Sequence, residues 1–201
     1  NRPEGLVRVG RSFFYTKLEG DVGYVYLRRV DRSAAPGIDE ALKAHPGMLG
    51  WIDDLRGNGG GGYDAKLIDR IKHFPRPVAV VIDAGCASAG ETLARDFRRY
   101  AGARLFGSKT AGSSSSKRTW TFPSGVASVV MPTRSRWTAD RKPIEFNGID
   151  PDVEVEAVAE EVAAGKNSAT LRAKEYLARE VGETSAVRKK PSPPAPLPQT
   201  R

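Results

Sequence analysis

The stretch PVAVVIDAGCASAGE at residues 77–91 passes from an apolar run to small residues, and it decides the fold of this chain. Its first half has the β-branched content of a buried strand, and a helical pattern then extends from about Glu91 to Tyr100. This change of element places one hydroxyl, that of Ser88, at a helix N-terminus. Small neighbours admit a substrate carbonyl, and the unpaired N–H groups of the helix can stabilise a developing negative charge. The segment therefore predicts an acyl-transfer nucleophile, with simple helix capping by Ser88 as the alternative.

A glycine-rich loop upstream follows another strand-like segment. Residues 48–55 read MLGWIDDL and lead into RGNGGGG at residues 56–62, which precedes a helical pattern at residues 63–72. Main-chain N–H groups of such a loop can face an anion, because no Cβ stands in the way. The alternative is a flexible surface turn, which the flanking strand and helix disfavour.

Strands and helices alternate along the rest of the chain, so we expect an α/β fold with a mainly parallel sheet flanked by helices. A hairpin is expected late in the chain, around Pro123 and Ser124. The predicted strands are residues 23–28, 103–107, 119–122 and 125–131, and the predicted helices are residues 35–44, 157–164 and 168–181.

Four motifs, in this order, resemble those of the carboxyl-terminal processing (tail-specific) serine peptidases, family S41. They are DLRGNGGG at residues 54–61, ASAGE at 87–91, GSKTAG at 107–112 and NGIDPD at 147–152. The resemblance covers about residues 23–155 and continues weakly near residues 166–179. It implies a crotonase-like or ClpP-like core and a serine endopeptidase that hydrolyses peptide bonds through an acyl-enzyme at Ser88. The implied oxyanion donors are the amides of Gly60, Gly61 and Ala89.

The chain departs from this pattern at the general base. In the family, a lysine on the strand after the Thr-x-Gly turn takes the serine's proton, and Ser113 stands at the matching position here. Lys117 lies four residues further on, and in an extended strand it points to the same face as Ser113. We therefore expect Lys117 as the base, provided that burial lowers the pKa of its amine. The alternative is a solvated lysine.

Two readings of a different kind remain open. Ser113 favours a catalytically silent relative that keeps the cleft for peptides or small ligands. The pattern Gly57-x-Gly59-x-x-Gly62, followed by a strand ending in Asp83, also fits a dinucleotide-binding loop, although Asp53, Asp54 and Arg56 interrupt the apolar approach that such a loop normally has. His45 and His73 fit helix ends better than a base.

Length and composition fit one globular domain with a tail. The 201 residues divide into an N-terminal lead-in (1–22), a catalytic core (23–157), a helical segment (158–183) and a Pro-rich tail (184–201) that is expected to be disordered. The net charge is +8 and the pI is near 9.7. The basic residues are dispersed along the chain and do not alternate with aromatic residues, which argues against nucleic-acid binding. No apolar run is long enough to span a membrane.

Cysteine usage and the family resemblance set further expectations. Cys86 is the single cysteine, so no internal disulfide forms, and we expect a small buried residue there rather than a nucleophile. No metal or cofactor is predicted. The resemblance implies a protein or peptide substrate and an extracytoplasmic (periplasmic or secreted) location. Because only residues 1–22 precede the first expected core strand, substrate selection is expected from the cleft, a partner chain or a missing N-terminal portion.

Overall fold

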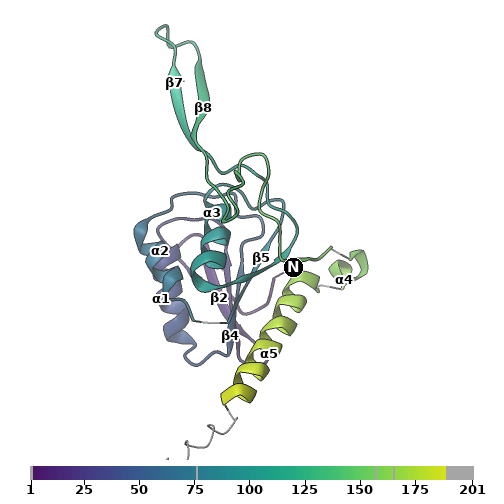
Figure 1. Cartoon of the computed structure of the whole chain (residues 1–201). Helices are drawn as coiled ribbons and strands as arrows, with labels where there is room; N and C mark the ends of the chain where they lie inside the picture. Colours follow the sequence, from purple (N-terminus) through teal and green to yellow (C-terminus); the bar gives the residue numbers. More distant parts are fainter. Residues whose placement is uncertain (1, 76, 157, 165, 189–201) are drawn as a thin grey trace, which may run out of the picture.

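The computed structural model describes residues 2–75, 77–156, 158–164 and 166–188, and its centre is a seven-stranded sheet (Figure 1). The strands, in sheet order, are β1 (Val7–Val9), β2 (Phe13–Leu18), β3 (Val22–Leu27), β4 (Gly50–Asp54), β5 (Val78–Ile82), β6 (Arg104–Gly107) and β9 (Val153–Glu154). β1, β2 and β3 are antiparallel, whereas β3, β4, β5, β6 and β9 run parallel. The predicted mainly parallel sheet is confirmed.

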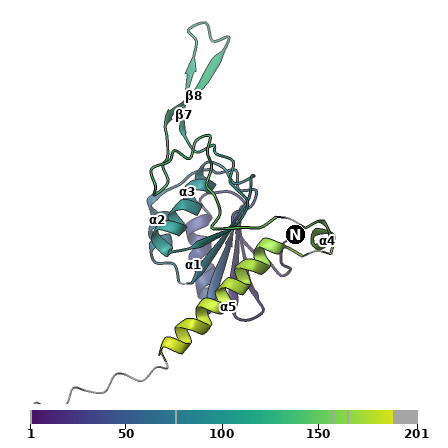
Figure 2. The ribbon, with the colours of Figure 1, turned by 45° about the vertical axis from the view of Figure 1, so that its right-hand side comes forward.

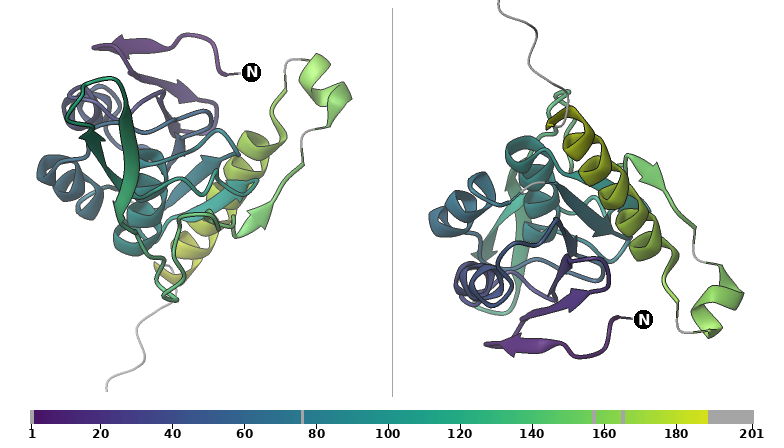
Figure 3. Two further views of the ribbon diagram at one scale, coloured as in Figure 1. Left: turned by 90° about the horizontal axis from the view of Figure 1, so that it is seen from above. Right: turned by 90° about the horizontal axis from the view of Figure 1, so that it is seen from below.

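Helices cover both faces of this sheet (Figure 3). The helical elements are α1 (Ala34–Ala44), α2 (Ala65–Lys72), α3 (Ala89–Asp96), the π-helix η1 (Phe97–Ala101), α4 (Ala159–Ala163) and α5 (Ser168–Arg188). α1, α2, α3 and η1 bury apolar side chains such as Ile38, Ile71 and Leu93 against one face. α5 buries Ala173 and Leu177 against the other face. The carboxyl ends of the parallel strands therefore emerge between two helical layers, where α/β folds place their sites.

A separate two-stranded hairpin projects from this body, as Figures 1 and 2 show. It consists of β7 (Ser116–Thr121) and β8 (Ser128–Arg134), and every residue of both strands is exposed. The predicted late hairpin is confirmed. Its first strand begins earlier than expected, its second lies further along the chain than expected, and residues 122–127 connect them. Nothing in the described part of the chain forms a helix long and apolar enough to cross a bilayer.

Two boundaries differ from the sequence-based expectation. The lead-in at residues 1–22 supplies β1 and β2, and it buries Phe13 and Tyr15 in the core because they share one face of β2. The tail expected from residue 184 begins inside α5, which continues to Arg188. The rest of that tail, residues 189–201, lies outside the described residues.

Candidate active site

Ser88 occupies the sharp turn between β5 and α3. Its backbone has φ +55° and ψ −118°, a conformation that non-glycine residues rarely adopt and that concentrates at functional sites. The residue is half-buried and stands immediately before the first residue of α3. The turn therefore holds the hydroxyl at a helix N-terminus, as the sequence predicted.

The glycine loop packs directly against this serine. A Cβ built on Gly60 would lie 2.6 Å from Ser88 Cβ and 2.9 Å from the Ala89 nitrogen, so only glycine fits there without displacement. Gly60 also has φ +95°, which favours glycine independently. A Cβ on Gly61 would lie 1.9 Å from the Val30 carbonyl oxygen. Residues separated by almost thirty positions thus meet at one point.

The backbone N–H groups near Ser88 differ in whether they already donate a hydrogen bond within the protein. The Gly60 N–H donates to Asn58 Oδ1 at 2.9 Å, which speaks against its predicted role as an oxyanion donor. Gly61 and Ala89 line the same pocket as Ser88, and none of the hydrogen bonds within the described residues uses their N–H groups. These two amides are therefore the available pair for a negative oxygen.

Glu91 holds the serine turn against a second loop. Its buried carboxylate accepts hydrogen bonds from the Ser88 N–H (3.0 Å) and, across the site, from Thr110 Oγ1 (2.6 Å), the Gly112 N–H (2.8 Å) and the Ser113 N–H (3.0 Å). The serine-to-glutamate spacing of three is that of a capping box, a signal from which this anchor follows. Ser113 is therefore tied to Glu91 through its backbone.

Lys117 lines the Ser88 pocket, a hollow of about 350 Å³ to which Tyr63 and Arg136 also contribute. The lysine is exposed at the base of the hairpin. Glu145, which no sequence pattern indicated, accepts hydrogen bonds from the N–H groups of Ser114 and Ser115 at 2.7 Å each. Desolvation by burial raises the pKa of Glu145. The hydrogen bonds from Ser115 and Ser114 and the charge of Lys117 lower it, and the net effect is a lowered pKa.

The histidines and the cysteine are placed as expected. His45 and His73 end α1 and α2, and neither lines the Ser88 pocket. Cys86 is buried, and burial raises the pKa of its thiol, with Glu91 adding to the effect. A thiol in this state is a weak nucleophile, so Ser88 is the group that the site exposes for attack.

Several groups that a dinucleotide would need in the glycine loop are already hydrogen-bonded within the protein. Asp83, the residue expected near a ribose, instead accepts the N–H groups of Gly57 and Gly85 at 2.8 Å and 3.0 Å. The Gly62 N–H donates to the Val30 carbonyl at 2.9 Å. These contacts use the loop to build the protein's own turn.

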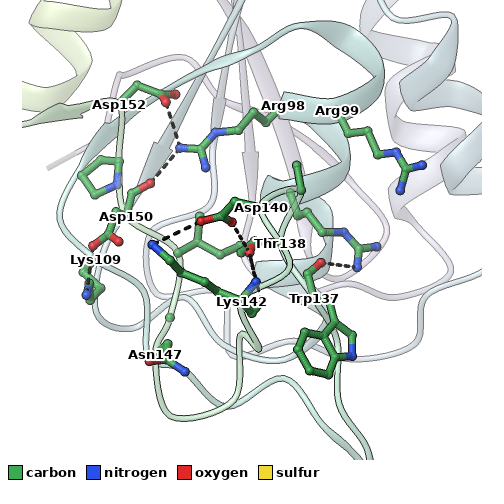
Figure 4. Close-up of a pocket in the computed structure, with 15 residues that line it drawn as sticks. Arg98, Arg99, Lys109, Trp137, Thr138, Asp140, Lys142, Asn147, Asp150 and Asp152 are labelled. Carbon is green, nitrogen blue, oxygen red and sulfur yellow. Dashed lines mark hydrogen bonds and ion pairs between the residues drawn. The ribbon is translucent and has the colours of Figure 1, made fainter.

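A larger cavity, of about 1030 Å³, lies beside α3 and η1, and Figure 4 shows its lining. Six of the charged groups in its lining form ion pairs with one another, Arg98–Asp152 (3.1 Å), Lys109–Asp150 (3.0 Å) and Lys142–Asp140 (3.2 Å). Neither Ser88 nor its glycine loop lines it, so we place the chemistry in the smaller pocket. No three His, Cys, Asp or Glu side chains gather as a metal site within the residues that the structure describes.

A parallel sheet between helices, with a strained serine at a strand-to-helix turn beside a glycine loop, defines a serine-hydrolase-like α/β domain. Within this class, the known proteins that the chain resembles include serine peptidases. Residues 63–155 match the sequence model of Peptidase family S41. Over 172 residues the chain is 27% identical to a Staphylococcus aureus (strain bovine RF122 / ET3-1) protein named "Probable CtpA-like serine protease". That match covers 70% of this chain and 34% of the relative, so the chain spans about a third of the relative's length.

Solved structures agree with this fold. A provisionally assigned peptidase from Parabacteroides merdae superposes with a TM-score of 0.75 and 21% identity, over 87% of this chain and 66% of the other. The photosystem II D1 C-terminal processing protease superposes with a TM-score of 0.56 and 21% identity, over 70% and 45%. The predicted resemblance to family S41 and the predicted crotonase/ClpP-like fold are confirmed.

Proposed function

We propose that this chain carries the catalytic site of a serine endopeptidase of the tail-specific processing type, with Ser88 as the nucleophile. The observation that carries the proposal is the packing of Gly60 against Ser88, which brings the strained serine, the Gly61 amide and the Ala89 amide into one pocket. The match to Peptidase family S41 supports the same chemistry and a protein or peptide substrate.

In the proposed reaction, Ser88 Oγ attacks the carbonyl carbon of the peptide bond and gives its proton to the base. The carbonyl oxygen becomes an oxyanion, and the N–H groups of Gly61 and Ala89 stabilise it. Collapse of this adduct breaks the C–N bond, and the base returns the proton to the leaving amine. Water then attacks the acyl-enzyme in the same manner and releases the acid and free Ser88.

Lys117 is the proposed base, because it lines the Ser88 pocket and no histidine does so within the described chain. A lysine amine can act as a general base only in its neutral form. A bound peptide that covers the pocket would desolvate the amine and favour its neutral form. The base is therefore proposed to be completed by substrate.

A fluorophosphonate probe tests the nucleophile, since covalent labelling requires an activated hydroxyl. We expect labelling at Ser88, and none in Ser88→Ala. Lys117→Ala should lower peptide hydrolysis at least about a hundredfold, because general-base catalysis contributes roughly 10²- to 10⁴-fold. Lys142→Ala is the matched control, since Lys142 is an exposed lysine paired with Asp140 outside the Ser88 pocket. Equal hydrolysis by both lysine variants would remove Lys117 from the mechanism.

The second candidate is a catalytically silent relative that binds peptides or small ligands. Ser113 at the family's lysine position and the exposure of Lys117 favour it. Failure of the probe to label folded wild-type protein would select this candidate. The extracytoplasmic location is also proposed on resemblance alone, and fractionation of cells that express the full-length protein tests it.

A further inference from the structure

The hairpin of β7 and β8, here called the hairpin arm, exposes an unusual number of apolar side chains. Six large exposed apolar residues fall within twelve positions of the arm: Trp120, Phe122, Val126, Val129, Val130 and Met131. The arm stands clear of the body in both views of Figures 1 and 2. A contiguous apolar surface of this kind on a folded domain generally marks a binding site.

The strand register gathers four of these residues on one side. Trp120 lies opposite Val129, and Arg118 lies opposite Met131, so these pairs share a face. Phe122 follows β7 directly and donates its N–H to the Ala127 carbonyl at 3.0 Å, which continues the ladder by one step, so we place it on the same side. These four residues (Trp120, Phe122, Val129 and Met131), here called the apolar face, have exposures between 41% and 53% and share their side of the hairpin with Arg118. The opposite face carries Lys117, Thr119, Thr121 and Ser128, together with Val130.

A two-stranded hairpin with one bare apolar face is marginally stable in water by itself. It gains stability when a further strand or surface covers that face. A second copy of the arm fits poorly, because half-exposed side chains contribute on the order of 100 Å² each. Two such faces together would bury on the order of 800 Å², below the roughly 1,200 Å² of the smallest stable protein interfaces. A transient occupant is therefore favoured.

The position of the arm indicates which occupant. Lys117, the second residue of β7, lines the Ser88 pocket, and the strand continues outward from there to Trp120. Within the described residues β7 pairs with β8 alone, so its other edge has unpaired backbone groups. An extended peptide that leaves the Ser88 pocket can pair with this edge, and its alternate side chains then lie beside Trp120 on the apolar side of the extended sheet. Lys117 and Trp120 are three residues apart, which is about 10 Å along a strand.

We propose that the hairpin arm binds an extended, apolar segment of the peptide substrate, added as a third strand beside β7, about three to five residues from the scissile bond. This inference rests on the proposed function in one respect, the continuation of the peptide into the Ser88 pocket. It assigns substrate selection to the arm, through apolar residues away from the cleavage point.

The test uses Ser88→Ala protein, which cannot turn over its ligand, and a fluorescein-labelled twelve-residue peptide of alternating valine and threonine. Binding is followed by fluorescence anisotropy. Val129→Thr combined with Trp120→Thr changes the apolar face, and Val130→Thr is the matched control, the same substitution one residue along on the opposite face. We expect the double variant to weaken binding at least about tenfold and the control to change it less than twofold. Val129→Thr alone, which keeps a β-branched residue, should show part of the loss if the hairpin still forms.

The outcomes separate this inference from the proposed function. Face-dependent peptide binding without fluorophosphonate labelling of wild-type protein would keep the arm as a peptide site and reject hydrolysis. Labelling of Ser88 without face-dependent binding would keep the hydrolase and overturn the role of the arm. A dimer in sedimentation that Trp120→Thr dissolves, or face-dependent binding to phosphatidylcholine vesicles in place of the peptide, would also overturn it.

Discussion

Substitution of Gly60 by alanine should damage both the stability of this protein and its reactive serine. The added Cβ would lie 2.6 Å from Ser88 Cβ, 2.9 Å from the Ala89 nitrogen and 3.0 Å from the Ala87 oxygen. Two of these atoms belong to the backbone, so no side-chain rotation can relieve the overlap. Gly60 also has φ +95°, where an alanine is strained.

The size of the effect follows from these two terms. Overpacking in a close-packed region costs about 1–3 kcal/mol, and a residue held in a sparsely populated backbone region costs about 1–3 kcal/mol. The free energy of unfolding should therefore fall by about 2–6 kcal/mol, a large part of the roughly 5–15 kcal/mol typical of a domain. For a chain of this length, the melting temperature should drop by roughly 5–20 °C.

Thermal and urea unfolding followed by circular dichroism measures this loss, and Gly59→Ala is the matched control. A Cβ on Gly59 meets no atom within 4 Å, so this neighbouring change should alter the free energy of unfolding by less than about 0.5 kcal/mol. Fluorophosphonate labelling below the melting temperature should be lost in Gly60→Ala and retained in Gly59→Ala. Equal stability and equal labelling of the two variants would refute the convergence of the loop on Ser88.

Two further predictions concern buried carboxyl groups. Glu91→Gln should lower the free energy of unfolding by about 3–5 kcal/mol. Each carboxylate oxygen now accepts two hydrogen bonds, and the amide NH₂ that replaces one of them would face those donors without accepting from them. Urea unfolding tests this, and a loss below 1 kcal/mol would contradict it. Asp53 is buried, and this burial, with the charge of Asp54 adding to it, raises the pKa of Asp53 well above its usual value. The folded state then holds a proton that the unfolded state releases above about pH 4, so this contribution to stability is lost as pH rises from there toward the raised pKa. Asp53→Asn should therefore gain stability relative to wild type between pH 4 and 7, and parallel pH profiles in urea unfolding would rule this out.

Much of the fold follows from local patterns. The segments expected as strands at residues 23–28 and 103–107 are β3 and β6 to within a residue, and the helix expected at residues 35–44 is α1. These elements have strong periodicity and clear ends. β1 and β2 were missed. They form consecutive antiparallel hairpins with β3, and the contact that buries Phe13 of β2 comes from α1 at Gly37, more than twenty residues further along the chain.

The candidate site divides in the same way. The strand-to-helix turn and the glycine run indicate Ser88, Gly61 and Ala89, and their placement around one pocket agrees with that expectation. The roles of these residues, of Gly60 and of Lys117 stay predictions. The bond from the Gly60 N–H to Asn58 and the approach of Glu145 to Ser114 had no signal in the sequence.

The sequence by itself determined the order of the strands and helices from β3 to the hairpin, the serine at a helix start and the glycine loop, because periodicity, capping and glycine content act between near neighbours. Only the tertiary structure decided that Gly60 touches Ser88, that Glu91 ties the serine turn to Thr110 and Gly112, and that the hairpin arm leaves its apolar face bare. The contacts of Gly60 and Glu91 join segments about twenty to thirty residues apart. They depend on how the parallel strands bring their carboxyl ends together, which no local pattern encodes.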